Sequence, residues 1–484
     1  MAAGSVEMKV YDMKEVCKHT TEQDCWMVLY NRVYNLSSYL GLHPAGKEIL
    51  LQYAGKDATQ IFQTIHSEPI LRTLLPKDCL LGKIAVDSIE PHHKAIDKSL
   101  HRKRANIAPL AKLINIFDFE QNAAKILAGS RAYNHIFGGA CDEITLRKNA
   151  TFFNKIYFRP KVMVDVSNIS MECKLFGLYP CSFPLFLSTT GLAGLAHPDA
   201  ECALINAAKR EHIYFCLSTF PSKSFDEIAR DCVDADYKDN CLMFQAYILK
   251  DRARIEELIE NAVKHGFCKI LCITVDHAVG GKRERDMRGF QSHAGIAKHL
   301  APMISDALNW SDLQWIKQFV QELSVKYAVR SGIKLVLKGI QSGWDAINAY
   351  KHGVDGIIVS NHGGRQLDYS RASMQVLIEV MRDLKRIDAA DKLEVYMDGG
   401  IRRGSDIFKA LAVGAKAVGI GRAALWGLTC YGQEGAQRVI QCLRNELEIT
   451  MKLMGVTSIE EIRANMYKHA DNNMLIVDDI VCRL

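Results

Sequence analysis

Two segments of the chain combine a histidine, an aspartate and two arginines in a pattern that suits acid–base chemistry on a carboxylic acid. SNHGGRQLD places His362 and Arg365 three residues apart, and TVDHAVGGKRERD supplies Asp276 and Arg283. A histidine with a near-neutral pKa takes up a proton, and a guanidinium holds a carboxylate through two parallel hydrogen bonds. Asp276 can orient His362 and stabilise its imidazolium form. We therefore predict that these residues bind and deprotonate a carboxylate substrate.

Two later segments, DGGIRRGSD and GIGR, are rich in glycine and arginine. A single Gly-Gly pair is most often only a turn. Backbone amides freed by glycine, together with arginine, also make a phosphate seat, and barrel enzymes bind cofactor phosphates after their seventh and eighth strands. The sequence therefore predicts a phosphate site at Gly399, Gly400, Gly421 and Arg422.

The elements that must position these residues repeat from about Leu185 onward. The apolar runs PLFLST, HIYFCLS, CLMFQAYI, KILCITVD, KLVLKGI, GIIVSNH, LEVYMDGG and AVGIGR alternate with helix-like stretches such as SMQVLIEVMRDLKR. Such strands predict a parallel sheet covered on both faces, and eight of them predict a closed (β/α)8 barrel. Polar or ionisable residues end nearly every run, among them Thr190, Ser218, Gln245, Tyr247, Thr274, Lys338 and Asp398. One such residue could be a satisfied cap, but a succession of eight polar strand ends favours an active site.

The N-terminal part carries a second pair of candidate ligands, His43 and His66, which frame the segment HPAGKEILLQYAGKDATQIFQTIHS. His43 follows a strand-and-turn segment and precedes a helix, and His66 ends a second helix. A histidine after an apolar stretch is more often a core residue than a ligand. Two histidines framed by helices also suit axial ligation of a haem iron, and zinc is less favoured because no third or fourth Cys/His ligand has finger-like spacing.

Composition excludes several classes of protein. The chain has 484 residues, and its net charge of +6 is too diffuse to indicate a nucleic-acid partner. Fifteen cysteines without a C-x-x-C pair, and a start without a signal or transit peptide, predict a reducing compartment. The charge-free stretch from Leu175 to Ala196 is interrupted by prolines, so we predict a buried strand and loop and a soluble protein without a membrane span.

A polar, basic stretch separates two units of different composition. Residues 87–104 contain Pro91, three histidines and the run KSLHRKR, which predict a solvated hinge. We therefore expect a small unit over 1–86 and the barrel unit over 105–484.

The residues from about Leu110 to Asn465 resemble the FMN-dependent L-2-hydroxy-acid oxidases and dehydrogenases, on the motifs SNHGGRQLD, DGGIRRGSD and FRPKVMVDVSNI. The resemblance implies that His362, paired with Asp276, is the base at the hydroxyl-bearing carbon, and that Arg365, Arg283 and Tyr247 bind substrate. It places Lys338 beside the flavin, where its charge stabilises the reduced form. The implied FMN-binding residues are Thr190, Gly191, Ser218, Gln245, Thr274, Lys338, Ser360, Asp398, Gly399, Gly400, Arg402, Gly421 and Arg422.

The chain departs from the family pattern near the substrate. His135 stands in YNHIFGGACDE where the family usually has a tyrosine that binds the substrate carboxylate. Histidine can still donate a hydrogen bond, with a different shape and pH response. Gly191 replaces an alanine beside the flavin, Gly280 replaces a common leucine, and Phe220 occupies a size-determining position. The two glycines predict room for a substrate bulkier than glycolate.

The residues from about Lys9 to Ile84 resemble the cytochrome b5 family, on DCWMVLYNRVYNLSSYL, HPAG and AGKDAT. The resemblance implies haem b ligated by His43 and His66. Ala45 departs from the family's HPGG, at a cost of roughly 1 kcal/mol if the position takes a positive φ.

Together the two resemblances imply an α/β chain, with an FMN-binding (β/α)8 barrel preceded by a small α+β haem domain. The expected reaction is oxidation of an L-2-hydroxy acid, L-lactate first, with electrons passing from FMN to the haem and on to cytochrome c or a similar acceptor. Hydride and carbanion routes both remain open. The alternatives are a peroxisomal oxidase that gives hydrogen peroxide from O₂ and, less favoured, a redox sensor.

The same resemblance implies a homo-oligomer, with four copies expected. The ending Cys482-Arg483-Leu484 predicts a peroxisomal address, with the mitochondrial intermembrane space or the cytosol as alternatives.

Overall fold

The computed structural model describes the residues 8–43, 47–59, 75–85, 103–232, 243–288, 303–464, 474–477 and 480–483, and the single positions 62, 68, 71 and 88. Ala45, His66 and Leu484 lie outside the described residues, as does most of the predicted hinge over 87–104.

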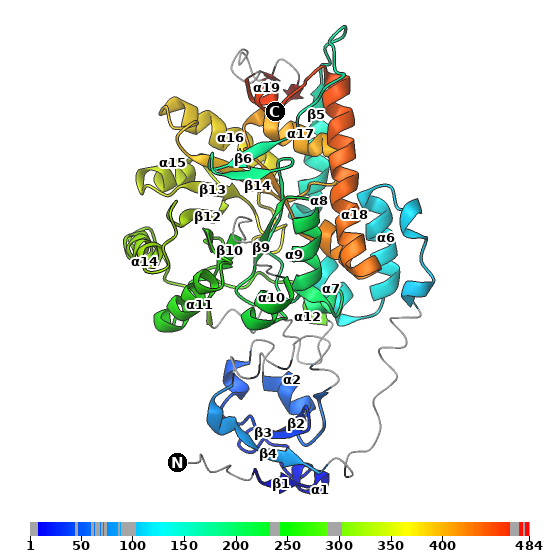
Figure 1. Cartoon of the computed structure of the whole chain (residues 1–484), viewed down its shortest axis with the longest axis vertical. Coiled ribbons are helices and arrows are strands. Elements are labelled where there is room, and N and C mark those ends of the chain that lie inside the picture. Colours follow the sequence, from blue (N-terminus) through cyan, green and yellow to red (C-terminus); the bar gives the residue numbers. More distant parts are fainter. Residues whose placement is uncertain are drawn as a thin grey trace.

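Eight parallel strands close into a barrel, which confirms the prediction from the apolar runs (Figure 1). Around the barrel the strands follow the order β10-β11-β12-β13-β14-β15-β8-β9. Their side chains are almost all buried, because each strand lies between the barrel interior and the surrounding helices. The strands are β8 (Leu185–Leu187), β9 (Tyr214–Leu217), β10 (Met243–Ala246), β11 (Ile270–Thr274), β12 (Lys334–Ile340), β13 (Gly356–Val359), β14 (Glu394–Asp398) and β15 (Val418–Ile420).

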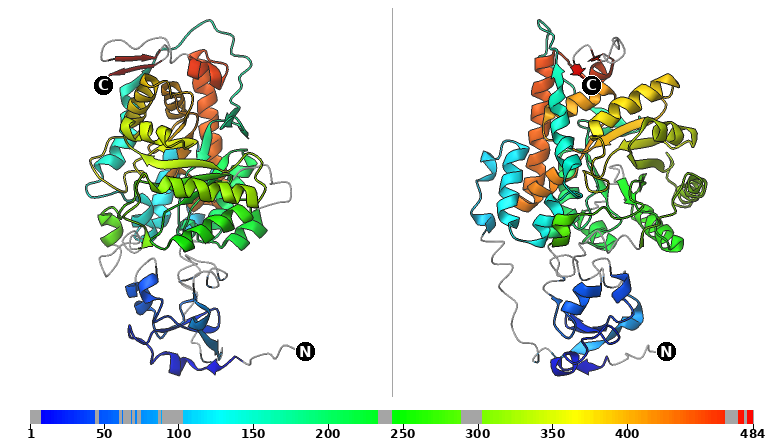
Figure 2. Two further views of the ribbon diagram at one scale, coloured as in Figure 1. Left: turned by 90° about the vertical axis from the view of Figure 1, so that its left-hand side faces the viewer. Right: turned by 180° about the vertical axis from the view of Figure 1, so that it is seen from behind.

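Amphipathic helices surround the barrel (Figure 2). In α16, for example, Met374, Leu377, Val380 and Leu384 are buried at helical spacing. The helices between or after barrel strands are α9 (Ala200–Arg210), α10 (Phe225–Cys232), α11 (Arg252–Lys264), α12 (Glu284–Arg288), α14 (Asp312–Lys326), α15 (Gly343–Lys351), α16 (Ser373–Arg386), α17 (Gly404–Val413), α18 (Arg422–Met454) and α19 (Ile459–Ala464), with the 3-10 turn η6 (Ala193–Leu195).

Three helices before the first barrel strand pack against the barrel and its last long helix: α6 (Ile116–Leu127), α7 (Arg131–Phe137) and α8 (Ile144–Thr151), with the 3-10 turns η4 (Leu110–Lys112) and η5 (Phe152–Lys155). The Ser130 side chain caps α7 by accepting a hydrogen bond from Tyr133 N. This cap fixes where α7 begins, and His135 lies in its last turn. Helix α7 packs against α12, so segments about 150 residues apart meet at one end of the barrel.

Two small antiparallel sheets complete the barrel unit. The hairpin β6 (Cys173–Leu175) and β7 (Tyr179–Cys181) precedes the first barrel strand, and β5 (Ile156–Phe158) pairs with β17 (Ile480–Arg483), which pairs with β16 (Met474–Val477). The charge-free stretch from Leu175 to Ala196 therefore forms short strands and loops, as predicted. Within the described ranges, no helix is long and apolar enough to cross a membrane.

The N-terminal unit is built on a four-stranded sheet in the order β1-β4-β3-β2. Its buried apolar side chains form two separate cores, one that includes Leu36 and Leu40 and one that includes Val28 and Val33. The elements are β1 (Val10–Tyr11), α1 (Met13–Val16), β2 (Trp26–Leu29), β3 (Arg32–Asn35), η1 (Leu40–Leu42), α2 (Lys47–Gln52), η2 (Lys77–Cys79) and β4 (Leu80–Ile84).

Candidate active site

A cavity of about 220 Å³ lies at the carboxyl ends of the barrel strands, and we call it the strand-end cavity. Most predicted site residues line it: His135, Thr190, Gly191, Ser218, Gln245, Tyr247, Arg283, Lys338, His362, Arg365, Asp398, Gly399, Gly400, Arg402, Gly421 and Arg422. Thr274, Asp276 and Ser360 lie behind this lining and hydrogen-bond to it. The structure therefore brings the predicted barrel residues together at one place.

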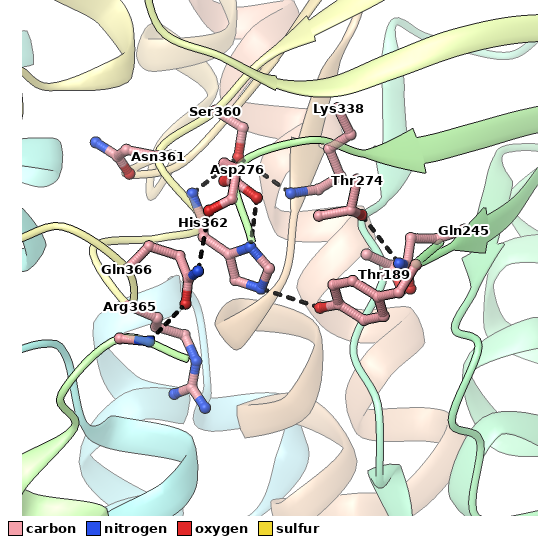
Figure 3. Close-up of polar contacts among 12 residues, drawn as sticks. Thr189, Gln245, Thr274, Asp276, Lys338, Ser360, Asn361, His362, Arg365 and Gln366 are labelled. Atoms are coloured by element: carbon pink, nitrogen blue, oxygen red, sulfur yellow. Dashed lines mark hydrogen bonds and ion pairs between the residues drawn. The ribbon is translucent and has the colours of Figure 1, made fainter. Parts of the chain in front are cut away.

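His362 and Asp276 form a buried pair, with His362 Nδ1 3.0 Å from Asp276 Oδ1 (Figure 3). His362 has a left-handed backbone conformation at φ 57°, and its N–H donates to Ser360 Oγ at 3.1 Å. The other ring nitrogen, Nε2, is 3.4 Å from the Tyr247 hydroxyl. The loop after β13 thus turns the imidazole so that one nitrogen faces Asp276 and the other faces the substrate side of the cavity.

The surroundings keep His362 neutral. Burial lowers its pKa, the negative charge of Asp276 opposes this effect only in part, and Lys338 and Arg283 add to the lowering. For Asp276, burial alone would raise the pKa, but His362 and Lys338 outweigh it and the pKa is lowered. Neutral His362 therefore donates Nδ1–H to an ionised Asp276 and presents the lone pair of Nε2, which is the state of a general base.

Arg365 and Arg283 place two positive charges beside this base. Arg365 donates to the carbonyl oxygens of His135 at 2.6 Å and Gly138 at 3.1 Å, and Arg283 donates to the carbonyl oxygen of Arg365 at 3.1 Å. Burial, together with repulsion from Arg283 and Arg422, lowers the pKa of Arg365 well below its ordinary value. An anion in the cavity relieves this repulsion, so the pair suits a substrate carboxylate.

The ring nitrogens of His135 face protein groups, although its place in the family pattern predicts a hydrogen bond to the substrate carboxylate. Its Nδ1 lies 3.2 Å from Asp286 Oδ2, and its Nε2 lies 3.4 Å from an Arg365 nitrogen. Burial lowers the pKa of His135 to about 4, although the hydrogen bond with Asp286 opposes it. Neutral His135 then donates from Nδ1 to Asp286 and accepts at Nε2 from Arg365. In this arrangement it holds Arg365 in place and has no N–H left for the substrate carboxylate.

Asp286 was missed by the sequence analysis. It is 1% exposed on α12, three residues after Arg283. The only signal in the sequence is this helical spacing, which places Asp286 and Arg283 on neighbouring positions of one face. His277, directly after Asp276, and Asn149 of α8 also line the strand-end cavity and were not predicted.

Lys338 offers a fixed positive charge in the same cavity. Lys338 Nζ donates to Ser360 Oγ at 3.1 Å and lies 3.4 Å from Asp398 Oδ2. Burial disfavours the charged amine, but attraction to Asp398 and Asp276 outweighs burial and raises the pKa of Lys338. A cation at this position suits the electron-rich edge of a flavin.

The residues around Lys338 fit FMN. Thr190 Oγ1 is buried and has no hydrogen-bond partner among the described residues, so a ligand hydroxyl or phosphate could satisfy it. A Cβ at Gly421 would meet only a Thr190 methyl, at 3.6 Å, which leaves an open cradle at the N-terminus of α18. Gly400 has φ 87°, and a Cβ there would clash with Asn149 O at 2.1 Å, so only glycine allows this close approach.

Two arginines of the predicted FMN site, Arg402 and Arg422, already have oxygen partners. Arg402 forms a bidentate ion pair with Glu120 at 2.9 and 3.0 Å. The Arg422 guanidinium donates to three carbonyl oxygens, those of Ile136, Gly138 and Gly363. Their contact with a phosphate therefore stays a prediction.

The structure bears on the prediction that Gly191 and Gly280 make room for a bulkier substrate. Gly191 lines the cavity, but a Cβ there would lie 3.2 Å from Phe220 O and Ser218 Oγ, so this glycine relieves a tight contact more than it opens a space. Phe220 lines the cavity and stacks on Tyr247 with ring centroids 5.9 Å apart. Gly280 is not among the lining residues, and the structure gives no support to its predicted widening of the cavity.

In the N-terminal unit, His43 directly follows η1 and precedes α2, as expected. Its ring centroid is 6.1 Å from that of Tyr39, and Leu36, Leu40 and Ala54 belong to the adjoining apolar core. An imidazole beside an apolar core suits haem b. His66, the second predicted ligand, lies outside the described residues.

Comparison with known protein families gives one match for each unit. Residues 123–469 match the family model described as FMN-dependent dehydrogenase, and residues 9–85 match the model described as cytochrome b5-like heme/steroid binding domain.

Curated relatives include both dehydrogenases and oxidases. An L-lactate dehydrogenase (cytochrome) from Wickerhamomyces anomalus is 37% identical over 463 residues, covering 92% of this chain and 78% of that protein. The enzyme of the same description from Saccharomyces cerevisiae is 33% identical and covers 93% of this chain and 78% of that protein. An L-lactate oxidase from Nostoc is 38% identical over 372 residues, covering 72% of this chain and 96% of the oxidase.

Among solved structures, the recombinant flavin-binding domain of baker's yeast flavocytochrome b2 superposes with a TM-score of 0.70 at 33% identity, over 79% of this chain and 95% of that one.

Proposed function

This chain belongs to the FMN-dependent dehydrogenase family and carries a cytochrome b5-like domain before its barrel, and from this premise we propose that it oxidises L-lactate or a related L-2-hydroxy acid to the 2-oxo acid. The observation that carries the proposal is neutral His362, held by Asp276 in a cavity that also contains Arg365 and Lys338. FMN supplies the acceptor for two electrons, and haem b supplies a one-electron carrier toward cytochrome c or a similar acceptor.

The cations of the cavity orient the substrate. Arg365, positioned by His135 and Gly138, binds the carboxylate, and Arg283 adds its charge from behind. The Tyr247 hydroxyl points to the same place as His362 Nε2, and burial raises the pKa of Tyr247, so it stays a hydrogen-bond donor. A hydroxy acid held at these three groups has its hydroxyl-bearing carbon next to the base.

His362 takes up the proton at Nε2. The imidazolium that forms is stabilised by Asp276, whose Oδ1 is 3.0 Å from Nδ1. Lys338 remains protonated and stabilises negative charge that develops on its side of the cavity. The side chains of the two supporting carboxylates, Asp276 and Asp398, are 1% and 9% exposed, which keeps water from screening them.

The N-terminal unit lies at the end of the barrel that carries α7 and α12 (Figures 1 and 2). His135 of α7 and Arg283, which precedes α12, line the strand-end cavity. This placement supports electron transfer from the barrel to the haem.

The experiment that tests the proposal measures where electrons from L-lactate go in air. We expect cytochrome c reduction to exceed hydrogen peroxide release, and His43→Ala to abolish the former. His19→Ala is the matched control, because His19 lies in the same unit but stacks on Trp26 between Glu15 and Asp24. Peroxide as the main product, with no effect of His43→Ala, would favour the oxidase alternative, which the Nostoc relative represents.

The remaining parts of the proposal rest on family resemblance for the oligomer, on composition for the hinge and on the ending Cys482-Arg483-Leu484 for the compartment. We infer a homo-oligomer of four copies, a hinge over 87–104 between units 1–86 and 105–484, and residence in the peroxisome, the mitochondrial intermembrane space or the cytosol. Light scattering measures the number of copies in the oligomer, and imaging of a fluorescent fusion identifies the compartment.

A further inference from the structure

His277 is a buried polar side chain in the strand-end cavity that the mechanism above does not use. It follows Asp276 directly, is 6% exposed and lines the cavity. Its Nδ1 is buried and has no hydrogen-bond partner among the described residues. A buried ring nitrogen without a partner calls for an explanation, because most such groups are satisfied by the protein, by water or by a ligand.

The surroundings of His277 favour its uncharged form. Burial lowers its pKa to about 4 and the charge of Arg283 adds to the effect, while a contact with its own backbone and the charge of Asp276 oppose it. A neutral imidazole carries one N–H donor and one acceptor nitrogen. The cavity therefore contains an uncharged hydrogen-bonding group in addition to the base and the two arginines.

His277 lies beside the two aromatic groups that the proposed mechanism places at the reacting carbon. Its ring centroid lies 5.1 Å from that of Tyr247 and 6.0 Å from that of His362, and all three side chains line the strand-end cavity. The carboxylate is drawn to Arg365, which contacts His135 and α7. The third substituent of the reacting carbon then faces the remaining wall, which includes Phe220, His277 and Ile304.

We propose that His277 hydrogen-bonds a polar, uncharged group on the substrate side chain, so that the preferred L-2-hydroxy acids carry a second hydroxyl, on C3. This inference rests on the proposed function and names its substrate class. A hydroxyl both donates and accepts, so it pairs with His277 in either tautomer, whereas a methyl pairs with neither. A second carboxylate would meet neutral His277 at this wall, where it has no cation as its direct partner.

The test compares two substrates that differ by one group. L-2,3-dihydroxypropanoate and L-2-hydroxybutyrate have the same number of heavy atoms, with a hydroxyl in one where the other has a methyl. The wild type should show a kcat/KM about tenfold or more in favour of the dihydroxy acid, because a buried group built to bond a hydroxyl rejects the analogue that lacks it. His277→Leu should reverse the preference, and His277→Asn, which keeps a donor and an acceptor, should retain it.

Phe220→Leu is the matched control, since it enlarges the same wall without changing its polarity and should shift both substrates together. Equal kcat/KM values in the wild type would overturn the proposal, and so would a His277→Leu variant with an unchanged ratio. If His277→Leu does not fold, the wild-type ratio and the His277→Asn ratio decide. Failure of the proposed function looks different, because then no hydroxy acid bleaches the flavin at all.

Discussion

The strand-end cavity has a substrate end at His362 and a cofactor end at Lys338, which meet at Ser360, and each buries a basic side chain beside a carboxylate, with opposite results. At the substrate end, burial lowers the pKa of His362 although Asp276 lies 3.0 Å away. At the cofactor end, burial also disfavours the charge on Lys338, but attraction to Asp398, 3.4 Å away, and to Asp276 raises its pKa.

The neighbouring charges explain the difference. Lys338 and Arg283 both oppose protonation of His362, so Asp276 only partly offsets burial. The charges that act most strongly on Lys338 are those of Asp398 and Asp276, and both favour the cation. The fold thus makes a proton acceptor at one end and a constant positive charge at the other, and the roles depend on surroundings as much as on residue type.

Removal of the base should have the largest effect. His362→Gln should lower turnover about 10⁴-fold, since general-base catalysis is lost. FMN should remain bound, because the residues around Lys338 are intact, and its visible absorbance checks this. His352→Gln is the control, because His352 is an exposed histidine directly after α15 whose Nδ1 bonds to the Asn348 carbonyl. Turnover by His362→Gln at the wild-type rate would contradict the assignment of the base.

Removal of the partner carboxylate should have the next largest effect and should also shift the pH profile. His362 acts while neutral, so kcat/KM should fall as the pH drops below its pKa, which lies below the ordinary 6.5. Asp276 raises that pKa, so Asp276→Asn should move the acidic limb to still lower pH and reduce turnover about 10³-fold. A limb that moves to higher pH would show that Asp276 does not act on His362 as described.

At the other end of the cavity, Lys338→Met should slow flavin reduction about 10²-fold, because an electrostatic contact to developing charge is lost. It also leaves Asp398 buried without its cation, so the melting temperature should fall. Lys409→Met is the matched control, a second buried lysine, which donates to the Phe153 carbonyl away from the cavity. If both variants slow flavin reduction equally, the effect is structural and the comparison of the two ends fails.

The smallest expected effect concerns His135. His135→Phe removes the nitrogen that accepts from Arg365, so KM for L-lactate should rise about tenfold, as expected for a lost hydrogen bond to a charged group. The kcat should change less, because the base is untouched. Asp286→Asn should give a similar change through His135. A large fall in kcat with constant KM would indicate a direct role for His135 in the chemical step.

Sequence patterns sufficed for the barrel and for the contact between Asp276 and His362. The apolar runs that end in TVD and SNH are parallel strands. Because a parallel barrel places the carboxyl ends of its strands at one face, the sequence predicts that Asp276 and His362 lie close together. Contacts between helices far apart in the chain were not predictable in this way. Glu120 of α6 pairs with Arg402, and Asp286 of α12 fixes the tautomer of His135 in α7. His277 lies just past β11, where strand alternation no longer indicates which way a side chain points.

The most direct test of the account mixes the intact protein with L-lactate under anaerobic conditions and follows flavin and haem absorbance together in a stopped-flow instrument. We expect flavin bleaching first and growth of the reduced haem band afterwards, with a haem rate that never exceeds the flavin rate. Haem reduction without prior flavin bleaching, or flavin bleaching by L-lactate with a haem that stays oxidised, would contradict the account.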